Sequence, residues 1–241
     1  MAKLNVGTAG WSIPRQYADR FPSTGTSLER YCALFPAAEI NSSFHRPHRR
    51  STWERWRDSV PETFRFSAKL PKEITHQRKL LDCGEAIETF VEQVTVMGEK
   101  LAIILVQLPP KLSFDESVAA RFYEALARSS PAQIACEPRN PSWFTPAADA
   151  LLDGLRIARV AADPAICGEA AVPGGWRGLS YWRLHGTPVV YRSSYADRIA
   201  IYADRLKQAE RSAQQVWCMF DNTASSAAIG DALALEAGLK T

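Results

Sequence analysis

The chain has 241 residues, of which 46% are hydrophobic and 23% are charged. These are ordinary values for a globular protein, and they exclude a disordered, collagen-like or coiled-coil chain. The longest apolar run, residues 101–106, is much shorter than the roughly 20 residues of a membrane span, so we expect no membrane association. The N-terminus shows no apolar signal segment, and the five scattered cysteines form no C-x-x-C pair. We therefore expect a cytoplasmic protein with reduced thiols.

The net charge of +3 is unevenly distributed. Residues 45–79 contain ten Arg and Lys against four Asp and Glu, together with Trp53, Trp56 and three of the four histidines. A positive region attracts anions, so nucleic acid is a candidate partner of this stretch. A solvated basic helix that covers two packed tryptophans is the simpler interpretation.

Alternation of apolar and polar residues predicts eight strands, at 4–8, 37–41, 64–69, 102–107, 133–139, 156–163, 180–185 and 215–222. Helical spacing predicts helices over 27–35, 83–97, 115–127, 195–212 and 225–235, whereas 164–178 resembles a loop. Eight such units of about 30 residues match a single (β/α)8 TIM-barrel-like domain over residues 1–241, with an irregular sixth helix. A doubly wound sheet is the alternative, but it usually has fewer strands and a glycine-rich first turn.

In seven of these strands, alternation places polar residues on the inward face near the C-terminal end. These residues are Glu39 and Asn41, Lys69, Gln107, Glu137 and Arg139, Asp163, Arg183 and His185, and Asp221. Because the strands of a barrel end at one mouth, and because unpaired buried charges are costly, this pattern predicts a functional site. A purely structural cluster of ion pairs is the alternative.

The residue types indicate acid/base chemistry on an anion. The candidate catalytic residues are Glu39, Glu137, Asp163, His185 and Asp221, and the candidate ligand-binding residues are Asn41, Lys69, His76, Gln107, Arg139, Arg183 and Asn222. Histidine transfers protons near neutral pH, Lys and Arg bind phosphate or carboxylate, and Asn222 precedes a predicted helix N-terminus. A site for a divalent metal, formed by His185, Glu137, Asp163 and Asp221, is a further hypothesis, although nothing in the sequence requires a metal.

Short motifs along the chain resemble those of the YecE-like proteins, domain of unknown function 72. They are VGTAGWS at 6–12, EINSSF at 39–44, FSAK at 66–69, ITH at 74–76, QLPP at 107–110, EPRNPSW at 137–143, RLHG at 183–186 and FDNT at 220–223. The resemblance covers nearly the whole chain and implies a TIM-barrel-like fold without implying an activity. The chain departs from the family pattern at His45, where an aromatic residue is common, and at Pro138.

We therefore expect an enzyme that performs general acid/base hydrolysis on an anionic ligand, of phosphoester or sugar-phosphate type, bound at the C-terminal mouth. The alternatives are a nucleic-acid-binding or repair-type barrel that acts through 45–79, and a non-catalytic binder of small anions. We also expect the charged residues at the strand ends to share one cavity. In that case Arg183→Ala weakens anion binding by about 1–3 kcal/mol.

Overall fold

Strands and helices alternate along the computed structural model, which describes residues 3–240. The strands are β1 (Lys3–Thr8), β2 (Ala37–Ile40), β3 (Arg65–Lys69), β4 (Leu101–Gln107), β5 (Gln133–Glu137), β6 (Ile157–Arg159), β7 (Ala161–Asp163), β8 (Gly174–Gly175), β9 (Leu179–Leu184) and β10 (Gln215–Phe220). The helices are α1 (Ser27–Cys32), α2 (Ser42–His45), α3 (Arg50–Asp58), α4 (Gly84–Val94), α5 (Glu116–Ser129), α6 (Pro146–Gly154), α7 (Ile199–Ala209) and α8 (Ala227–Leu239). Short helical segments are η1 (Arg15–Arg20), η2 (Glu73–Gln77), η3 (Thr95–Lys100), η4 (Pro141–Trp143) and η5 (Gly168–Ala171).

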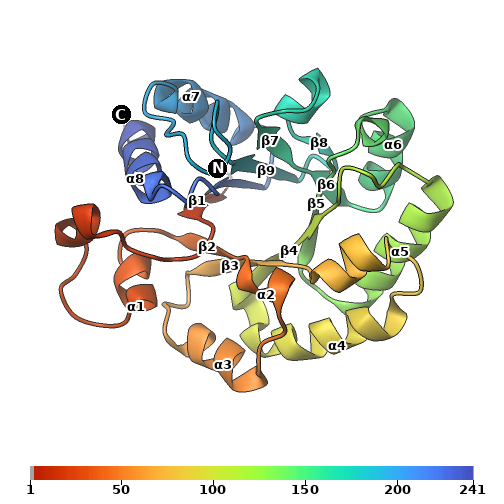
Figure 1. The fold of residues 1–241 in the computed structure, drawn as a ribbon, viewed down its shortest axis with the longest axis horizontal. Coiled ribbons are helices and arrows are strands. Elements are labelled where there is room, and N and C mark those ends of the chain that lie inside the picture. Colours follow the sequence, from red (N-terminus) through yellow and green to blue (C-terminus); the bar gives the residue numbers. More distant parts are fainter. Residues whose placement is uncertain (1–2, 241) are drawn as a thin grey trace.

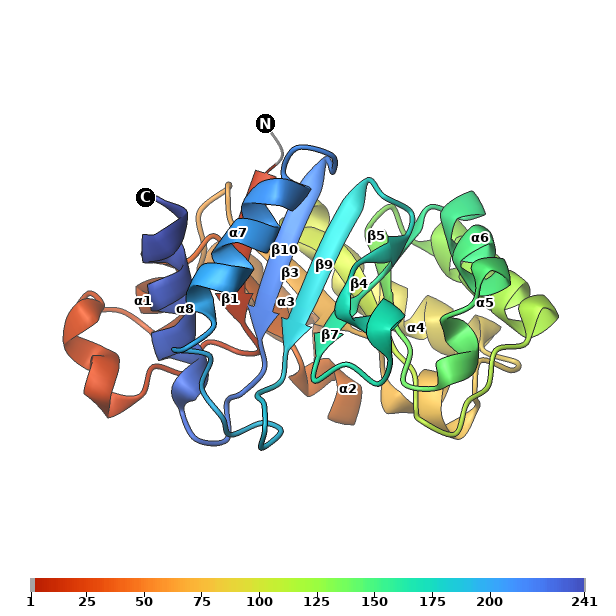
Figure 2. The ribbon, with the colours of Figure 1, turned by 90° about the horizontal axis from the view of Figure 1, so that it is seen from above.

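The strands form two sheets, surrounded by the helices (Figure 1). One sheet has the order β1-β10-β9-β7 and the other the order β2-β3-β4-β5-β6-β8. Every pairing is parallel except that of the two-residue strand β8 with β6. Figure 2 shows β10 and β9 side by side and pointing the same way. The fold is therefore α/β with parallel strands arranged as in a TIM barrel.

The two sheets do not join into one closed hydrogen-bonded sheet, so the predicted closed barrel is confirmed only in part. On one side the chain itself passes from β6 to β7 at Val160. On the other side β1 and β2 meet at a parallel bridge between Ala9 and Glu39. Below that bridge the hydroxyl of Tyr31 lies between the strands, where it accepts a hydrogen bond from the Thr8 N–H (2.8 Å) and donates to the Ala37 carbonyl (3.0 Å). The Tyr31 hydroxyl thus replaces part of the backbone hydrogen bonding between β1 and β2.

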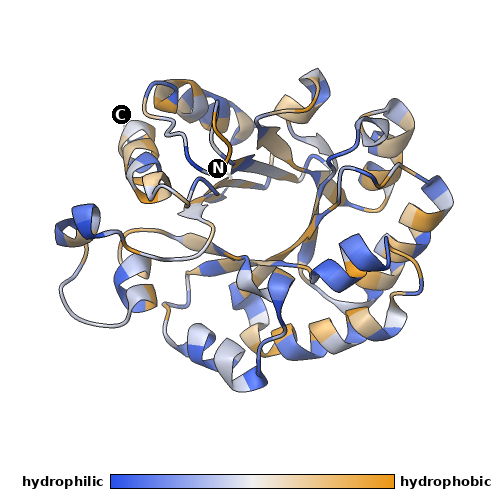
Figure 3. Ribbon diagram, in the orientation of Figure 1, coloured by the Kyte–Doolittle hydropathy of each residue, from blue (hydrophilic) through white to orange (hydrophobic). Residues whose placement is uncertain are grey.

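Apolar side chains pack on both faces of the strands. The inner layer contains Ala37, Ile103, Leu105, Ala135, Ala158, Val160, Leu179, Tyr181, Trp217 and Met219. A larger outer layer packs the opposite faces of the strands against the helices, which carry their hydrophilic residues toward solvent (Figure 3). The inner apolar layer fills the N-terminal part of the interior, so the polar inward residues lie above it, at the C-terminal ends.

Local sequence signals explain where the main helices begin. The side chain of Thr26 accepts a hydrogen bond from the Glu29 N–H, and the Glu29 carboxylate accepts one from the Thr26 N–H, which forms a capping box for α1. Asp115 caps α5 and Thr145 caps α6 in the same general way. Such caps satisfy N–H groups that a helix leaves unpaired at its start.

The sixth unit lacks a regular helix, as the sequence predicts. Residues 164–178 contain the single turn η5 and the short strand β8 in place of an α-helix. Within residues 3–240, no helix combines the length and the apolar character needed to cross a bilayer.

Gly7 is required by the close approach of β1 to β2. A Cβ atom at this position would lie 2.1 Å from the carbonyl oxygen of Ala37, a distance that real Cβ atoms do not show. Since that oxygen also accepts the hydrogen bond from Tyr31, it has little freedom to move. The glycine therefore sets how closely the two sheets approach each other.

We predict that Gly7→Ala lowers the free energy of unfolding by about 1–3 kcal/mol, because the added methyl group overpacks a buried backbone contact. The matched control is Gly84→Ala at the start of α4, where a Cβ meets no atom within 4 Å. Urea unfolding of both variants and the wild type measures the effect. Equal stability of Gly7→Ala and the wild type would show that β1 and β2 can separate freely.

Candidate functional site

A buried arginine lies at the centre of the polar residues. The Arg183 side chain extends from β9 into the interior and is 0% exposed. Its Nε and Nη2 atoms donate to the two carboxylate oxygens of Glu39 at 2.9 and 2.5 Å. Nη1 donates to Glu137 Oε2 at 2.5 Å, and Nη2 also donates to Asp221 Oδ2 at 3.0 Å. One guanidinium therefore binds three carboxylates, those of Glu39 in β2, Glu137 in β5 and Asp221 directly after β10.

We call Glu39, Glu137, Arg183, His185 and Asp221 the Arg183 cluster. Burial alone would lower the pKa of the Arg183 guanidinium, but the surrounding carboxylates hold it well above its ordinary value. Burial would likewise raise the pKa of Glu137, yet the positive charges of Arg183 and Arg139 hold it well below its usual range. Arg183 and Glu137 therefore stay ionised although both side chains are buried.

Neutral side chains satisfy the remaining lone pairs of these carboxylates. The hydroxyl of Tyr181 donates to Glu39 Oε2 at 2.9 Å and lies 3.1 Å from Ser67 Oγ. Gln107 Nε2 donates to Glu137 Oε2 at 3.1 Å. Such complete hydrogen bonding is what allows a buried ion pair to offset the cost of its desolvation.

His185 bridges two carboxylates of the cluster. Its Nδ1 lies 3.0 Å from Asp221 Oδ2, and its Nε2 lies 2.9 Å from Glu137 Oε1. Arg139 Nη2 lies 3.2 Å from the same Nε2 and donates to Glu137 Oε1 at 2.9 Å. Both ring nitrogens can donate to carboxylates only when the ring carries two protons, whereas Arg139 can donate to Nε2 only when that nitrogen is unprotonated.

Lys69 differs from the other buried charges because it has no carboxylate partner. The residue is 7% exposed, and its ammonium lies 4.2 Å from the centre of the Phe44 ring. Within residues 3–240 the ammonium makes no hydrogen bond or ion pair. Burial, followed by the positive charge of Arg183, lowers the pKa of the amine to about 8.

Arg139 and His76 lie nearer to solvent, at the rim of the mouth. The Arg139 side chain is 26% exposed. His76 Nδ1 is 2.8 Å from Thr75 Oγ1, and its ring meets Phe44 edge to face at 5.0 Å. Burial lowers the pKa of His76, and the charges of Lys69 and Arg139 lower it further. These pKa effects show that the three basic side chains share one electrostatic environment.

Asp163 does not lie in the cluster, so the prediction that it shares the cavity is wrong. Its carboxylate accepts hydrogen bonds from the hydroxyls of Thr187 and Tyr202 and from Arg198 Nη1 at 3.1 Å, on the side of α7. The reason is alternation: Ala158 and Val160 face the interior, so residue 163 has outward parity.

Two asparagines have different positions. Asn41 Nδ2 donates to Asp221 Oδ1 at 3.3 Å, so Asn41 borders the cluster, and its predicted ligand contact stays a prediction. Asn222 is buried and donates instead to Asp231 Oδ2 (2.6 Å) and to the Ser193 carbonyl (2.9 Å). Asn222 therefore connects the loop before α7 to α8, and the structure does not place it with the other candidate residues.

Sequence reasoning missed Tyr181 and Ser67 as partners of Glu39. Tyr181 lies two residues before Arg183 in β9, and Ser67 lies two residues before Lys69 in β3. Because side chains alternate along a strand, both face the interior as Arg183 and Lys69 do. The alternation itself carries this signal, because it places both residues on the inward face, one inward position before the strand ends.

The candidate metal ligands are not gathered around one point. Asp163 lies on the outer side, and the carboxylates of Glu137 and Asp221 are turned to Arg183. Across residues 3–240, no group of three or more His, Cys, Asp or Glu side chains has an arrangement suited to a metal ion.

The basic stretch at 45–79 contains a packed aromatic cluster. Trp53 is 0% exposed, and its ring meets those of Trp56 and His48 edge to face at 5.3 and 5.5 Å. Trp56 packs in turn on Trp11 at 5.2 Å. Trp53 therefore supports α3 from within, whereas Trp56 is half-buried and packs edge to face against its aromatic neighbours.

Comparison with known proteins identifies relatives of the whole chain. A family model described as "Protein of unknown function DUF72" matches residues 5–241. The UPF0759 protein YunF of Bacillus subtilis (strain 168) is 28% identical over 149 residues, which cover 59% of this chain and 53% of that protein. The UPF0759 protein YecE of Escherichia coli (strain K12) is 28% identical over 142 residues, 58% of this chain and 50% of that protein. The chain thus spans about half the length of the curated relatives that it matches.

Solved structures show the same fold. A DUF72 family protein from Enterococcus faecalis V583 has a TM-score of 0.82 at 20% identity, covering 99% of this chain and 96% of that one. One from Thermotoga maritima MSB8 has a TM-score of 0.80 at 21% identity, covering 99% and 100%. A D-psicose 3-epimerase from Clostridium cellulolyticum H10 has a TM-score of 0.55 at 9% identity, covering 98% and 97%. At these identities the likeness establishes the TIM-barrel-like fold alone.

We predict that Arg183→Met destabilises the protein by about 3–5 kcal/mol, because three buried carboxylates lose their shared counter-charge. The exposed pair Arg50–Glu54 provides the control, since Arg50→Met removes a surface ion pair worth about 0–1 kcal/mol. Thermal and denaturant unfolding measure both variants. A stable, folded Arg183→Met protein would contradict this role and would favour a solvated, ligand-binding arginine.

Proposed function

The chain belongs to the DUF72 family of proteins of unknown function, and we propose that it is an enzyme that performs general acid/base catalysis on a small anionic substrate at the C-terminal mouth of the strands. Lys69 and Arg139 hold the anion, and His185 transfers the proton. The reaction that we propose to test first is hydrolysis of a phosphoester or a sugar phosphate. Free cysteines throughout the described residues favour a reducing, cytoplasmic location.

The unpaired ammonium of Lys69 is the observation that carries this proposal. A nearly buried cation that forms no ion pair is costly, and the nearby carboxylates that partly offset its charge are engaged by Arg183. A bound anion would supply the missing partner through a charge-assisted hydrogen bond. With a pKa of about 8, the amine is mainly charged at neutral pH and can attract such an anion.

Arg139 adds the second cation that an oxyanion needs. It belongs to the rim, it is 26% exposed, and its charge acts on His76 together with that of Lys69. Arg183 is a poorer candidate than the sequence suggested, since its donors already bind Glu39, Glu137 and Asp221. The proposed anion contact therefore moves from Arg183 to the two cations nearer to solvent.

His185 has a hydrogen-bond arrangement that suits proton transfer. In the doubly protonated ring, Nε2 donates to Glu137 and Nδ1 donates to Asp221. After Nε2 loses its proton, Arg139 Nη2 can donate to it instead, while Nδ1 still donates to Asp221. Nδ1 thus keeps its partner in both states, while Nε2 exchanges the Glu137 acceptor for the Arg139 donor, an arrangement that supports the proposed proton transfer.

Nucleic-acid binding through residues 45–79 is the second candidate. The exposed Arg46, Arg49 and Arg55 form no ion pair within the described residues, which favours phosphate contacts. Because Trp53 is buried and Trp56 is half-buried among other rings, such binding would depend mainly on phosphates and would weaken steeply with salt. Fluorescence anisotropy at low salt tests it, and absence of binding there would eliminate this candidate.

We predict that the protein turns over at least one member of a panel of phosphate esters and sugar phosphates, assayed with and without divalent metals. His185→Gln should lower kcat by about 100-fold or more, as expected for loss of a general acid/base group. Thermal melts show whether the variant is folded. A folded wild type that binds sulfate but turns over no ester would indicate the non-catalytic anion binder instead.

We also predict that sulfate affinity decreases as the pH rises through about 8, because the Lys69 amine loses its charge while sulfate stays a dianion. Lys69→Met should weaken sulfate binding by about tenfold or more and should remove this pH step. Calorimetry between about pH 7 and pH 9.5 measures both effects. Unchanged binding by Lys69→Met at pH 7 would contradict the proposed anion site.

A further inference from the structure

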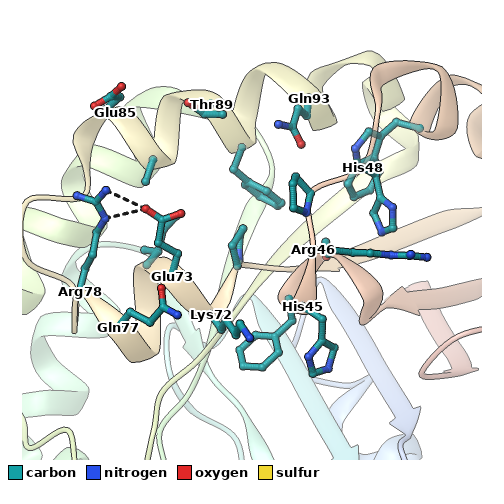
Figure 4. Close-up of a pocket in the computed structure, with 18 residues that line it drawn as sticks. His45, Arg46, His48, Lys72, Glu73, Gln77, Arg78, Glu85, Thr89 and Gln93 are labelled. Atoms are coloured by element: carbon teal, nitrogen blue, oxygen red, sulfur yellow. Dashed lines mark hydrogen bonds and ion pairs between the residues drawn. The ribbon is translucent and has the colours of Figure 1, made fainter.

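A pocket of about 470 Å³ lies beside the mouth, between α2, η2 and α4 (Figure 4). Its lining combines the apolar side chains of Phe44, Ile74 and Phe90 with polar groups, among them Gln77 and Gln93. Its volume is typical of a small-molecule site, as is an apolar wall with a few polar groups. No residue of the Arg183 cluster lines this pocket, and none of the residues to which we assign a catalytic role lines it either.

Phe44 connects this pocket with the proposed anion site. Its ring lines the pocket, and the ammonium of Lys69 lies 4.2 Å from the ring centre. The ring of His76 meets it edge to face at 5.0 Å. A ligand with its anionic group beside Lys69 therefore needs to extend past a single aromatic ring to reach the pocket.

Trp53 provides an independent sign that the pocket takes a ligand. Its side chain is 0% exposed and lines the pocket, yet its Nε1–H has no hydrogen-bond partner within residues 3–240. An unsatisfied buried donor is unfavourable, so an acceptor atom from a ligand would relieve a real cost. The side-chain amides of exposed Gln77 and half-buried Gln93 make no hydrogen bond within that range and are free to bind a ligand, and Figure 4 shows Gln93 pointing from α4 toward the pocket.

We propose that this pocket binds an aromatic ring that carries a hydrogen-bond acceptor, as part of the substrate whose anionic group is held by Lys69 and Arg139. The inference rests on the proposed function and gives the substrate class: an anionic ester of aryl type. Phe44 and Phe90 supply apolar faces for the ring. The indole of Trp53 and the free amides supply polar contacts to its edge.

The test uses two non-hydrolysable probes, methylphosphonate and 4-nitrobenzylphosphonate, with binding measured by calorimetry. The wild type should bind the aryl probe at least about tenfold more tightly, because its ring leaves water and its nitro group accepts from Trp53. Thr89→Trp places a large side chain from an exposed position of α4 into the pocket and should abolish this preference. The matched control is Glu88→Trp, at an exposed neighbouring position that does not line the pocket, and it should keep the preference.

The outcomes separate this inference from the proposed function. If methylphosphonate binds but the aryl probe binds no more tightly, or if Thr89→Trp and Glu88→Trp behave alike, the aromatic subsite is wrong and the anion site stands. If methylphosphonate does not bind, neutral 4-nitrobenzyl alcohol is titrated. Binding of the alcohol that Thr89→Trp removes would support the pocket while contradicting the anion site, and no binding by the folded wild type would overturn both.

Discussion

The buried guanidinium of Arg183 and its three carboxylates cross the interior between the two sheets. Arg183 and Asp221 belong to the sheet that contains β9 and β10, whereas Glu39 and Glu137 come from β2 and β5 of the other sheet. The backbone ladder is interrupted on both sides, at Val160 and beside Tyr31. Charged hydrogen bonds therefore add a connection across the interior between the two sheets, besides the backbone bridge at Ala9 and Glu39.

A buried ion-pair network is not by itself a large source of stability, because desolvation offsets much of the Coulomb attraction. Its effect here is on geometry. The directions of the guanidinium N–H bonds are fixed, so the three carboxylates can satisfy Arg183 only in one relative position of their strands. The cluster thereby determines where the neighbouring groups lie, and an apolar replacement of equal volume would lose that specification.

The same network produces the properties of the proposed site. Because Arg183 engages the carboxylates, Lys69 forms no ion pair of its own and stays available to a ligand. Because Glu137 and Asp221 are held in place, they position both ring nitrogens of His185. A structural cluster and a reactive site are thus two aspects of one arrangement. The sequence also allowed a purely structural cluster of ion pairs, and that interpretation describes Arg183 and its three carboxylates well. The proposed chemistry takes place at the rim, around Lys69, Arg139 and His185.

Alternation along the strands predicts most of the inward residues from the sequence alone. The positions of Glu39, Lys69, Glu137 and Arg183 follow from period-2 geometry, which holds wherever a strand is continuous. The prediction failed at Asp163 because the strand was given the wrong parity, and only the packing of Ala158 and Val160 in the interior shows which face points inward.

The sequence by itself determined the alternation of parallel strands with helices, the position of the irregular sixth unit and most of the polar residues that face inward. The tertiary structure decided which of those charges neutralise each other and which are left over. Pairing depends on distances of about 3 Å between side chains that are as much as 144 residues apart, as for Arg183 and Glu39. No local pattern encodes such a distance, so the engaged Arg183, the unpaired Lys69 and the unbonded indole of Trp53 became visible only in three dimensions.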